Sequence, residues 1–398
     1  MEENNLSHRP TRRESSERAR RRRMRDFNRL TALLLAAVIL VLTLVNLLVP
    51  DREFSENENR MLTVFPKPSW SDISDGSYMS SLSSYMTDQF VGRDNWISFK
   101  LTLDKLLGKR EANGVYLGKE DYLIGIPSEP DWEHVDRNLQ AINAFAQSHS
   151  DLSIHMSIIP NAACVLSDFL PQNAPVRDQR ADLAALQSKL DSSVAFIDVT
   201  EDLTAHAFEG LYYRTDHHWT TLGAYYAFLS MADSLQISDP LLNYNKYTVS
   251  DSFSGTLASK SGCHAVQDSI EVFEPLGTDV QYYVIYSDTH EKSASLYQSA
   301  YLKEKDQYAV FLGGNHPMVT IRTTNNNNRS LLVIKDSYAN SLIPFLVPYY
   351  EEIILVDPRY YYDSVESIIS SELITDVLFL YNLDTFLGDT SLADVLVQ

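Results

Sequence analysis

Residues 330–357 read SLLVIKDSYANSLIPFLVPYYEEIILVD, and this stretch decides the fold class. Two short runs rich in Val, Ile and Leu enclose a segment with helical spacing. The pattern continues outward: DVLFLYN lies downstream, and SIHMSIIP and AFIDVT lie upstream, with helical segments between them. Such alternation predicts an α/β fold, a three-layer αβα arrangement in which helices cover both faces of a mainly parallel sheet.

Ser337 closes the first of these runs and stands just before the predicted helix. In mainly parallel sheets, chemistry gathers at the carboxyl ends of the strands. A serine at that place exposes its oxygen, and nearby backbone N–H groups can stabilise developing negative charge. A strand ending in Asp-Ser is equally typical of an ordinary helix cap. Ser337 is therefore a candidate nucleophile whose interpretation depends on its partners.

The candidate partners lie in YYRTDHHWTTLGAYYAF, residues 212–228. Asp216 and His218 are two apart, so in an extended segment both side chains point to the same side. A carboxylate beside an imidazole fixes its tautomer and stabilises its charged form. We expect His217 to face the other way, either in a structural role or as support behind the residues of the site.

Two other interpretations of this segment stay open. Asp216 and His218 could form an ion pair that only supports the fold. Asp216, His217 and His218 could also bind a metal, although adjacent imidazoles rarely converge on one ion without further ligands. We predict that the site uses neither a metal nor another cofactor.

The order of these motifs resembles that of the SGNH (GDSL-type) hydrolases, in circularly permuted form. KDS at 335–337 and the strand ending at Asn382 correspond to the opening half of that family. AFIDVT and TDHHWTTLGAYYAF correspond to its closing half but come earlier in the chain. The resemblance implies a triad of Ser337, His218 and Asp216, with Asn382 and the Ser337 N–H binding the oxyanion.

Within that superfamily, TDHHW together with KDS is similar to the branch of alginate O-acetyltransferase-like and DHHW proteins. FSENENRMLTVFPKP and MTDQFVGRDNW also resemble this branch. The spacing is Asp-x-His where the wider family has Asp-x-x-His. No glycine follows EIILVD in the place where the family has one, since DPRYY stands there, so a second oxyanion donor stays unassigned.

The resemblance implies a serine acyltransferase that O-acetylates a polysaccharide of the cell surface. The alternatives are a carbohydrate acetyl-esterase with the same triad and a non-catalytic glycan-binding or assembly protein. Four further residues are candidates for contacts with the substrate: Trp219, Arg359, Tyr360 and Asn315. For each of them the competing interpretation is packing or a plain turn.

Charge and hydropathy indicate a membrane anchor. Residues 30–50, LTALLLAAVILVLTLVNLLVP, carry no charge over 21 positions, and a spanning helix needs about 20 residues. The Arg-rich segment before this run should stay in the cytoplasm, as a disordered tail. The remaining chain carries 23 basic and 48 acidic residues, which argues against nucleic acid as a partner.

We therefore expect a basic cytoplasmic tail at 1–29, a transmembrane anchor at 30–50, an extended and helical lead-in with a hairpin at 51–134, and a catalytic SGNH-like domain at 135–398. The catalytic domain would be extracytoplasmic. The resemblance implies a multi-spanning membrane acyltransferase as the acetyl donor. Cys164 and Cys263 could form one disulfide or remain two thiols.

Overall fold

The protein is described by a computed structural model that covers residues 12–55, 57–58 and 60–397. The chain divides into two compact units, one of Met1–Ser55 with Arg60–Ile97 and one of Glu56–Asn59 with Ser98–Gln398.

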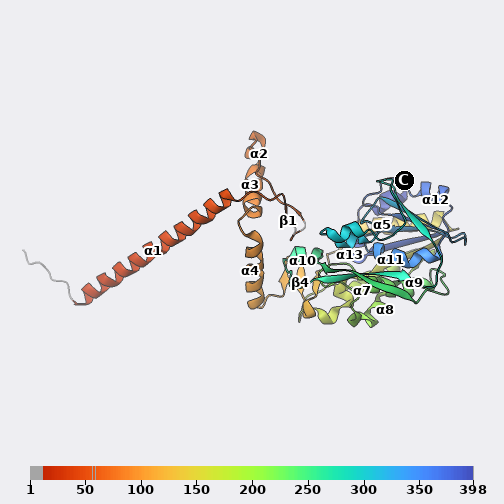
Figure 1. The fold of residues 1–398 in the computed structure, drawn as a ribbon, viewed down its shortest axis with the longest axis horizontal. Helices are drawn as coiled ribbons and strands as arrows, with labels where there is room; N and C mark the ends of the chain where they lie inside the picture. The colour runs from red at the N-terminus through yellow and green to blue at the C-terminus, as the bar shows by residue number, and fades with distance from the viewer. Residues whose placement is uncertain (1–11, 56, 59, 398) are drawn as a thin grey trace, which may run out of the picture. The chain divides into compact units, whose positions relative to one another are not determined.

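The first unit begins with a single long helix, α1 (Arg12–Leu48), drawn in red in Figure 1. Its segment Arg20–Leu48 is long and apolar enough to cross a membrane. The prediction of a disordered basic tail is wrong from Arg12 onward, and residues 1–11 lie outside the described part. Arg, Glu and Ala favour helices, and no Gly or Pro interrupts the sequence from 12 to 48.

Short elements follow α1. Strands β1 (Phe54–Ser55) and β2 (Arg60–Met61) pair antiparallel. The helices after them are α2 (Trp70–Ser74), α3 (Ser77–Asp88) and α4 (Arg93–Leu106). The expected hairpin is present as β4 (Val115–Leu117) and β5 (Leu123–Gly125), joined by β3 (Glu111–Ala112) into a three-stranded sheet.

An eight-stranded sheet forms the centre of the second unit, in the order β11-β10-β12-β14-β13-β15-β6-β7. The strands from β14 to β7 pair parallel, as the sequence predicts. At the other edge, β12, β10 and β11 add antiparallel pairs. The bounds are β6 (Ser153–Ile159), β7 (Val194–Phe196), β10 (Tyr282–Tyr286), β11 (Lys292–Ser293), β12 (Met318–Thr323), β13 (Ser330–Lys335), β14 (Glu352–Val356) and β15 (Asp376–Asn382).

Helices cover both faces of this sheet (Figure 1). The side chains of β13 divide between two cores, one on each face. Leu331 and Val333 belong to a core with α9 and α11, whereas Leu332 and Ile334 belong to a core with α5 and α13. Alternate residues of a strand point to opposite faces, so β13 is buried on both sides and the unit has the predicted three layers. The helices are α5 (Trp132–Ser148), α6 (Ala162–Val165), α7 (Gln179–Lys189), α8 (Thr200–Ala205), α9 (Thr221–Ala232), α11 (Ala339–Leu346), α12 (Glu366–Ser371), α13 (Leu383–Gly388) and α14 (Leu392–Val397).

One insertion matters for the site. Between α9 and β10 the chain forms β8 (Tyr244–Phe253), the short helix α10 (Thr256–Ser261) and β9 (Asp268–Pro275). Strands β8 and β9 pair antiparallel as a separate two-stranded sheet. The loop before α10 and the beginning of β9 lie against the Asp-His segment, as described below.

Candidate active site

Ser337 stands at the carboxyl end of β13, two residues after Lys335 and two before α11. The turn is held by Asp336, whose side chain is fully buried. Its carboxylate accepts the Tyr338 N–H at 2.9 Å and the Asn382 N–H at 2.9 Å, which ties the turn to the end of β15. Among the described residues, none accepts a hydrogen bond from the Ser337 N–H. This N–H therefore has the capacity to bind an anion beside the serine oxygen.

The structure brings Ser337, His218 and Asp216 into one hydrogen-bonded chain. The Ser337 Oγ lies 2.8 Å from His218 Nε2, and His218 Nδ1 lies 2.6 Å from Asp216 Oδ1. Because an ionised carboxylate can only accept, Nδ1 carries the proton and Nε2 is left to accept from the serine hydroxyl. This tautomer is the one that a general base for Ser337 requires.

Asp216 is buried, with 2% of its surface exposed. Its Oδ2 accepts the Thr256 N–H at 2.7 Å and the Thr256 hydroxyl at 2.9 Å. Burial alone would raise the pKa of Asp216, but His217, His218 and these hydrogen bonds outweigh it and hold the pKa well below its ordinary value. The carboxylate therefore stays ionised beside the imidazole.

A closed loop, and not an extended strand, presents these residues. Tyr212 and Trp219 form a β-bridge, and the residues between them make bends. The carboxylate of Asp268, at the start of β9, accepts the Arg214 N–H, the Thr215 N–H and the Thr215 hydroxyl at 2.9, 2.7 and 2.6 Å. The prediction that Asp216 and His218 share a side is met for another reason, since the Asp216 carboxylate also accepts the His218 N–H at 3.0 Å.

The expectation that His217 faces away from the pair is wrong. Its ring centroid lies 3.9 Å from that of His218, and its Nδ1 lies 2.7 Å from the Thr256 hydroxyl. The bend at Asp216 folds His217 back, whereas a strand would have turned it to the opposite side. Desolvation and the neighbouring His218 lower the pKa of His217 to about 4.

The aromatic contacts of His218 were not predicted from the sequence. Tyr308 stacks on the imidazole at a centroid distance of 3.8 Å and an interplanar angle of 11°. Its hydroxyl lies 3.2 Å from the Ser337 carbonyl oxygen and 3.1 Å from the Ser341 Oγ. Burial raises the pKa of Tyr308, so its hydroxyl remains a neutral donor. Tyr308 thus contacts both the imidazole and the serine residue.

Asn382 does not offer its amide as an oxyanion donor in this structure. The side-chain Nδ2 donates to the Asn161 Oδ1 at 2.6 Å and to the Ile159 carbonyl at 3.3 Å, so both of its hydrogens are used. Its Oδ1 accepts the Asp384 N–H at 3.1 Å and caps α13. The physical reason is that β6 ends beside β15 and places Asn161 within reach of Asn382.

Trp219 is not available to a substrate, and that prediction is corrected. The side chain is fully buried, and the indole N–H donates to the Tyr338 carbonyl at 3.0 Å. This bond joins the Asp-His loop to the serine turn. Trp219 therefore positions the two segments relative to each other.

The other three predicted contact residues lie at the surface. Arg359 forms a two-point ion pair with Asp357, at 2.8 and 2.6 Å, so its charge is already partnered. Tyr360 is 45% exposed beneath that guanidinium. Asn315 is exposed, and its Oδ1 accepts a bond of 3.2 Å from the Asn340 side chain. Asn340 in turn accepts a bond of 2.7 Å from the buried Lys335.

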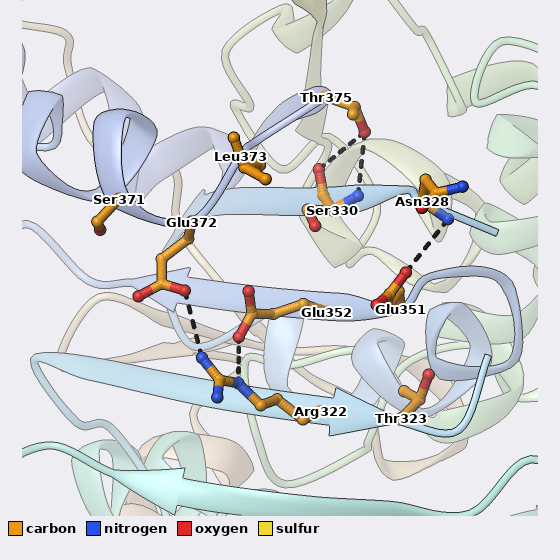
Figure 2. A pocket seen from close by; sticks show the side chains of 10 residues that line it. All are labelled: Arg322, Thr323, Asn328, Ser330, Glu351, Glu352, Ser371, Glu372, Leu373 and Thr375. Carbon is orange, nitrogen blue, oxygen red and sulfur yellow. Dashed lines mark hydrogen bonds and ion pairs between the residues drawn. The ribbon is translucent and has the colours of Figure 1, made fainter. Parts of the chain in front are cut away.

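A cavity of about 490 Å³ lies at the opposite end of the sheet from Ser337. Figure 2 shows Arg322 between Glu352 and Glu372, with ion pairs of 2.6 and 3.2 Å, and Ser330 at the start of β13. Because Ser330 begins the strand that Ser337 follows, this cavity is separate from the candidate active site.

A metal can also be considered at the Asp-His loop. Asp216, His217 and His218 each offer a ligand atom, and these atoms lie within 4.8 Å of one another. Asp216 and His218 nevertheless direct those atoms at each other and at Ser337, which is the arrangement of a proton relay.

The two cysteines, Cys164 and Cys263, are free in the structure, so the disulfide alternative does not hold.

Comparisons with known proteins agree on the fold. A family model described as "DHHW protein" matches residues 133–356. A DHHW family protein from Eubacterium siraeum is 26% identical with a TM-score of 0.62, over 71% of this chain and 95% of that one. Bacillus cereus PatB1, solved with a sulfonyl adduct, is 20% identical with a TM-score of 0.58, over 69% and 96%.

The O-acetyltransferase domain of Pseudomonas putida AlgJ is more distant, at 14% identity and a TM-score of 0.43, over 69% of this chain and 93% of that one. A search of curated proteins found no match. The fold is SGNH-like.

Proposed function

The chain belongs to the DHHW protein family, and from this premise we propose that it is a membrane-anchored serine acyltransferase that O-acetylates an extracytoplasmic glycan. One observation carries the proposal: the hydrogen-bonded chain from the Ser337 Oγ through His218 to Asp216, at 2.8 and 2.6 Å. A buried acid, an imidazole in the required tautomer and a serine at a strand end are the parts that acyl transfer needs.

In the first half-reaction, the Ser337 Oγ attacks the carbonyl carbon of an acetyl ester. His218 Nε2 takes the hydroxyl proton as the C–O bond forms, and Asp216 stabilises the resulting imidazolium. The carbonyl oxygen becomes an oxyanion, for which the Ser337 N–H is a donor. When the tetrahedral intermediate collapses, the imidazolium returns its proton to the departing alcohol, and an acetyl-serine remains.

In the second half-reaction, a sugar hydroxyl attacks the acetyl-serine. His218 takes the proton of that hydroxyl and passes it to the Ser337 Oγ as the serine leaves, so the free enzyme is regenerated. Water in place of the sugar gives the esterase. Whether transfer or hydrolysis prevails depends on whether the site binds a sugar hydroxyl or a water molecule next to the acetyl-serine.

The N-terminal helix supports the proposed membrane anchoring and the extracytoplasmic location of the α/β unit. Arg20–Leu48 is able to span a bilayer, and the positive-inside rule puts the Arg-rich end in the cytoplasm. The α/β unit then faces the cell envelope, where glycan acceptors are present. A multi-spanning membrane acyltransferase would deliver the acetyl group there, since acetyl donors are made in the cytoplasm.

Transferase and esterase are separated by one experiment on the full-length protein in detergent. The protein is incubated with an activated acetyl ester, with and without neutral oligosaccharides, beside Ser337→Ala. The proposal predicts oligosaccharides heavier by one acetyl group, formed only by the wild type. Hydrolysis of the ester at the same rate with and without oligosaccharides, and no acetylated oligosaccharide, would instead show that the protein is an esterase. No turnover above Ser337→Ala in either case would leave the glycan-binding protein as the better account.

A further inference from the structure

The proposed triad accounts for His218 but leaves the other imidazole of the motif, His217, without a role. His217 approaches the Asp216 side of the triad, and its Nδ1 lies 2.7 Å from the Thr256 hydroxyl. That hydroxyl lies 2.9 Å from Asp216 Oδ2. The same His217 Nδ1 lies farther, at 3.4 Å, from Asp216 Oδ1. The shorter contacts from the first histidine of the motif to the carboxylate therefore run through Thr256.

The direction of these hydrogen bonds follows from the count of protons. The Thr256 hydroxyl has one hydrogen and can accept further bonds at its oxygen. A hydrogen bond to an ionised carboxylate is stronger than one to a neutral imidazole, so the hydroxyl donates to Asp216. Its oxygen then accepts the Nδ1–H of His217. The proton of neutral His217 is therefore on Nδ1, so Nδ1 cannot act as a base.

The two oxygens of Asp216 thereby divide their partners. Within the described part of the chain, Oδ2 accepts only from Thr256, through both the N–H and the hydroxyl. Oδ1 accepts the N–H and the Nδ1–H of His218, and it lies 3.4 Å from the His217 Nδ1. The carboxylate cannot rotate about its own axis without losing bonds to both residues, so the plane of the imidazole is fixed from the far side of the triad.

Building on the proposed function, we infer that Thr256 is a positioning residue of the acyl-transfer site, and that His217 acts through it on Asp216. The relay runs His217, Thr256, Asp216, His218, Ser337. The charged groups that face His217 are Asp216 and His218 of its own loop, Asp306, Asp336 and Asp384. The insertion that carries α10 thus helps to position the proposed triad through Thr256.

The relay predicts a specific change in the pH profile. Without the Thr256 hydroxyl, the charge of Asp216 is less satisfied and interacts more strongly with protonated His218. The fall of kcat/KM on the acid side of the pH profile, its acid limb, then moves to higher pH. Damage to packing alone would lower kcat at every pH and leave the position of the limb unchanged.

The test compares Thr256→Val, Thr256→Ser and Thr248→Val in the full-length protein, using hydrolysis of an activated acetyl ester. Thr248 is an exposed residue of β8 and serves as the matched control. We expect Thr256→Val to lower kcat about tenfold or more with KM within twofold and to raise the acid limb. Thr256→Ser and Thr248→Val should stay near the wild type.

Wild-type kcat and an unmoved acid limb in Thr256→Val would overturn the inference, and so would an equal loss in Thr256→Ser. If Thr256→Val fails to fold, His217→Asn and His217→Ala decide, because the asparagine amide can still donate to Thr256. Equal activities in that pair would overturn the relay. A wild type no faster than Ser337→Ala contradicts the proposed function itself, and the relay with it.

Discussion

Gly255 packs its backbone directly against the side chain of Asp216. A Cβ atom on Gly255 would lie 2.3 Å from the Asp216 Cβ and 2.4 Å from its Oδ2. Atoms cannot approach so closely, so any residue larger than glycine must displace the carboxylate or the loop before α10. The geometry of the proposed triad therefore depends on a residue that lies well outside the DHHW motif.

Gly255→Ala should consequently lose activity on an acetyl ester by about 100-fold, because the displaced carboxylate can no longer orient His218. Overpacking of this kind costs about 1–3 kcal/mol of stability, so the variant should still fold. Gly388→Ala is the matched control, since nothing lies within 4 Å of a Cβ placed there. Kinetics and thermal melting of the two variants check the prediction, and full activity in Gly255→Ala would contradict it.

Tyr308 offers a second test, because its ring and its hydroxyl contact different parts of the site. Tyr308→Phe removes only the hydroxyl and should cost about 1 kcal/mol of stability, with less than a tenfold loss of activity. Tyr308→Ala also removes the ring that covers His218 and should cost about 3–5 kcal/mol. Equal kinetic losses in the two variants would show that the stacked ring contributes nothing to the alignment of His218.

Lys335 gives a prediction about stability and pH. Burial is the main cause that lowers its pKa to about 8, although Asp357 acts in the opposite direction. The unfolded chain has a lysine pKa of about 10.4, so between these values the unfolded state binds more protons and stability rises with pH. At pH below 8 the full cost of the buried charge is present.

The unfolding free energy of the wild type relative to Lys335→Met should therefore increase by about 2 kcal/mol between pH 7 and pH 9.5. Denaturant unfolding of both proteins at the two pH values measures this difference. Using the difference removes the titration of other groups that the proteins share. A difference independent of pH would mean that Lys335 is charged to the same extent in both states.

The sheet could be predicted from the sequence because its strands are buried on both faces and read as apolar runs. Leu331 to Ile334 supply both cores, so no polar residue interrupts the pattern. Strand ends then mark where Ser337 must lie, and the nearness of Asp216 and His218 in the sequence makes them candidate partners of each other. These local signals mark the candidates, whereas joining Ser337 to Asp216 and His218 in one triad depended on the resemblance to the SGNH motif order.

Residues that reach the site from distant segments had no such signal. Thr256, Gly255 and Tyr308 belong to the chain between α9 and β12, where no motif indicates that the loop before α10 lies on Asp216. The burial of Trp219 depends on a backbone carbonyl as its partner, which residue type does not reveal. The side-chain amide of Asn382 is taken by Asn161, a residue at the end of another strand.

The central claim is that Ser337 is the nucleophile, and covalent labelling tests it most directly. A sulfonyl fluoride reacts with a serine hydroxyl that a neighbouring base activates, so it is a suitable reagent for the full-length protein in detergent. Peptide mass spectrometry should place a single sulfonyl group on Ser337 in the wild type, with little label in Ser337→Ala or His218→Ala at equal melting temperature. A label on another residue, or equal labelling of all three proteins, would contradict the assignment of the nucleophile.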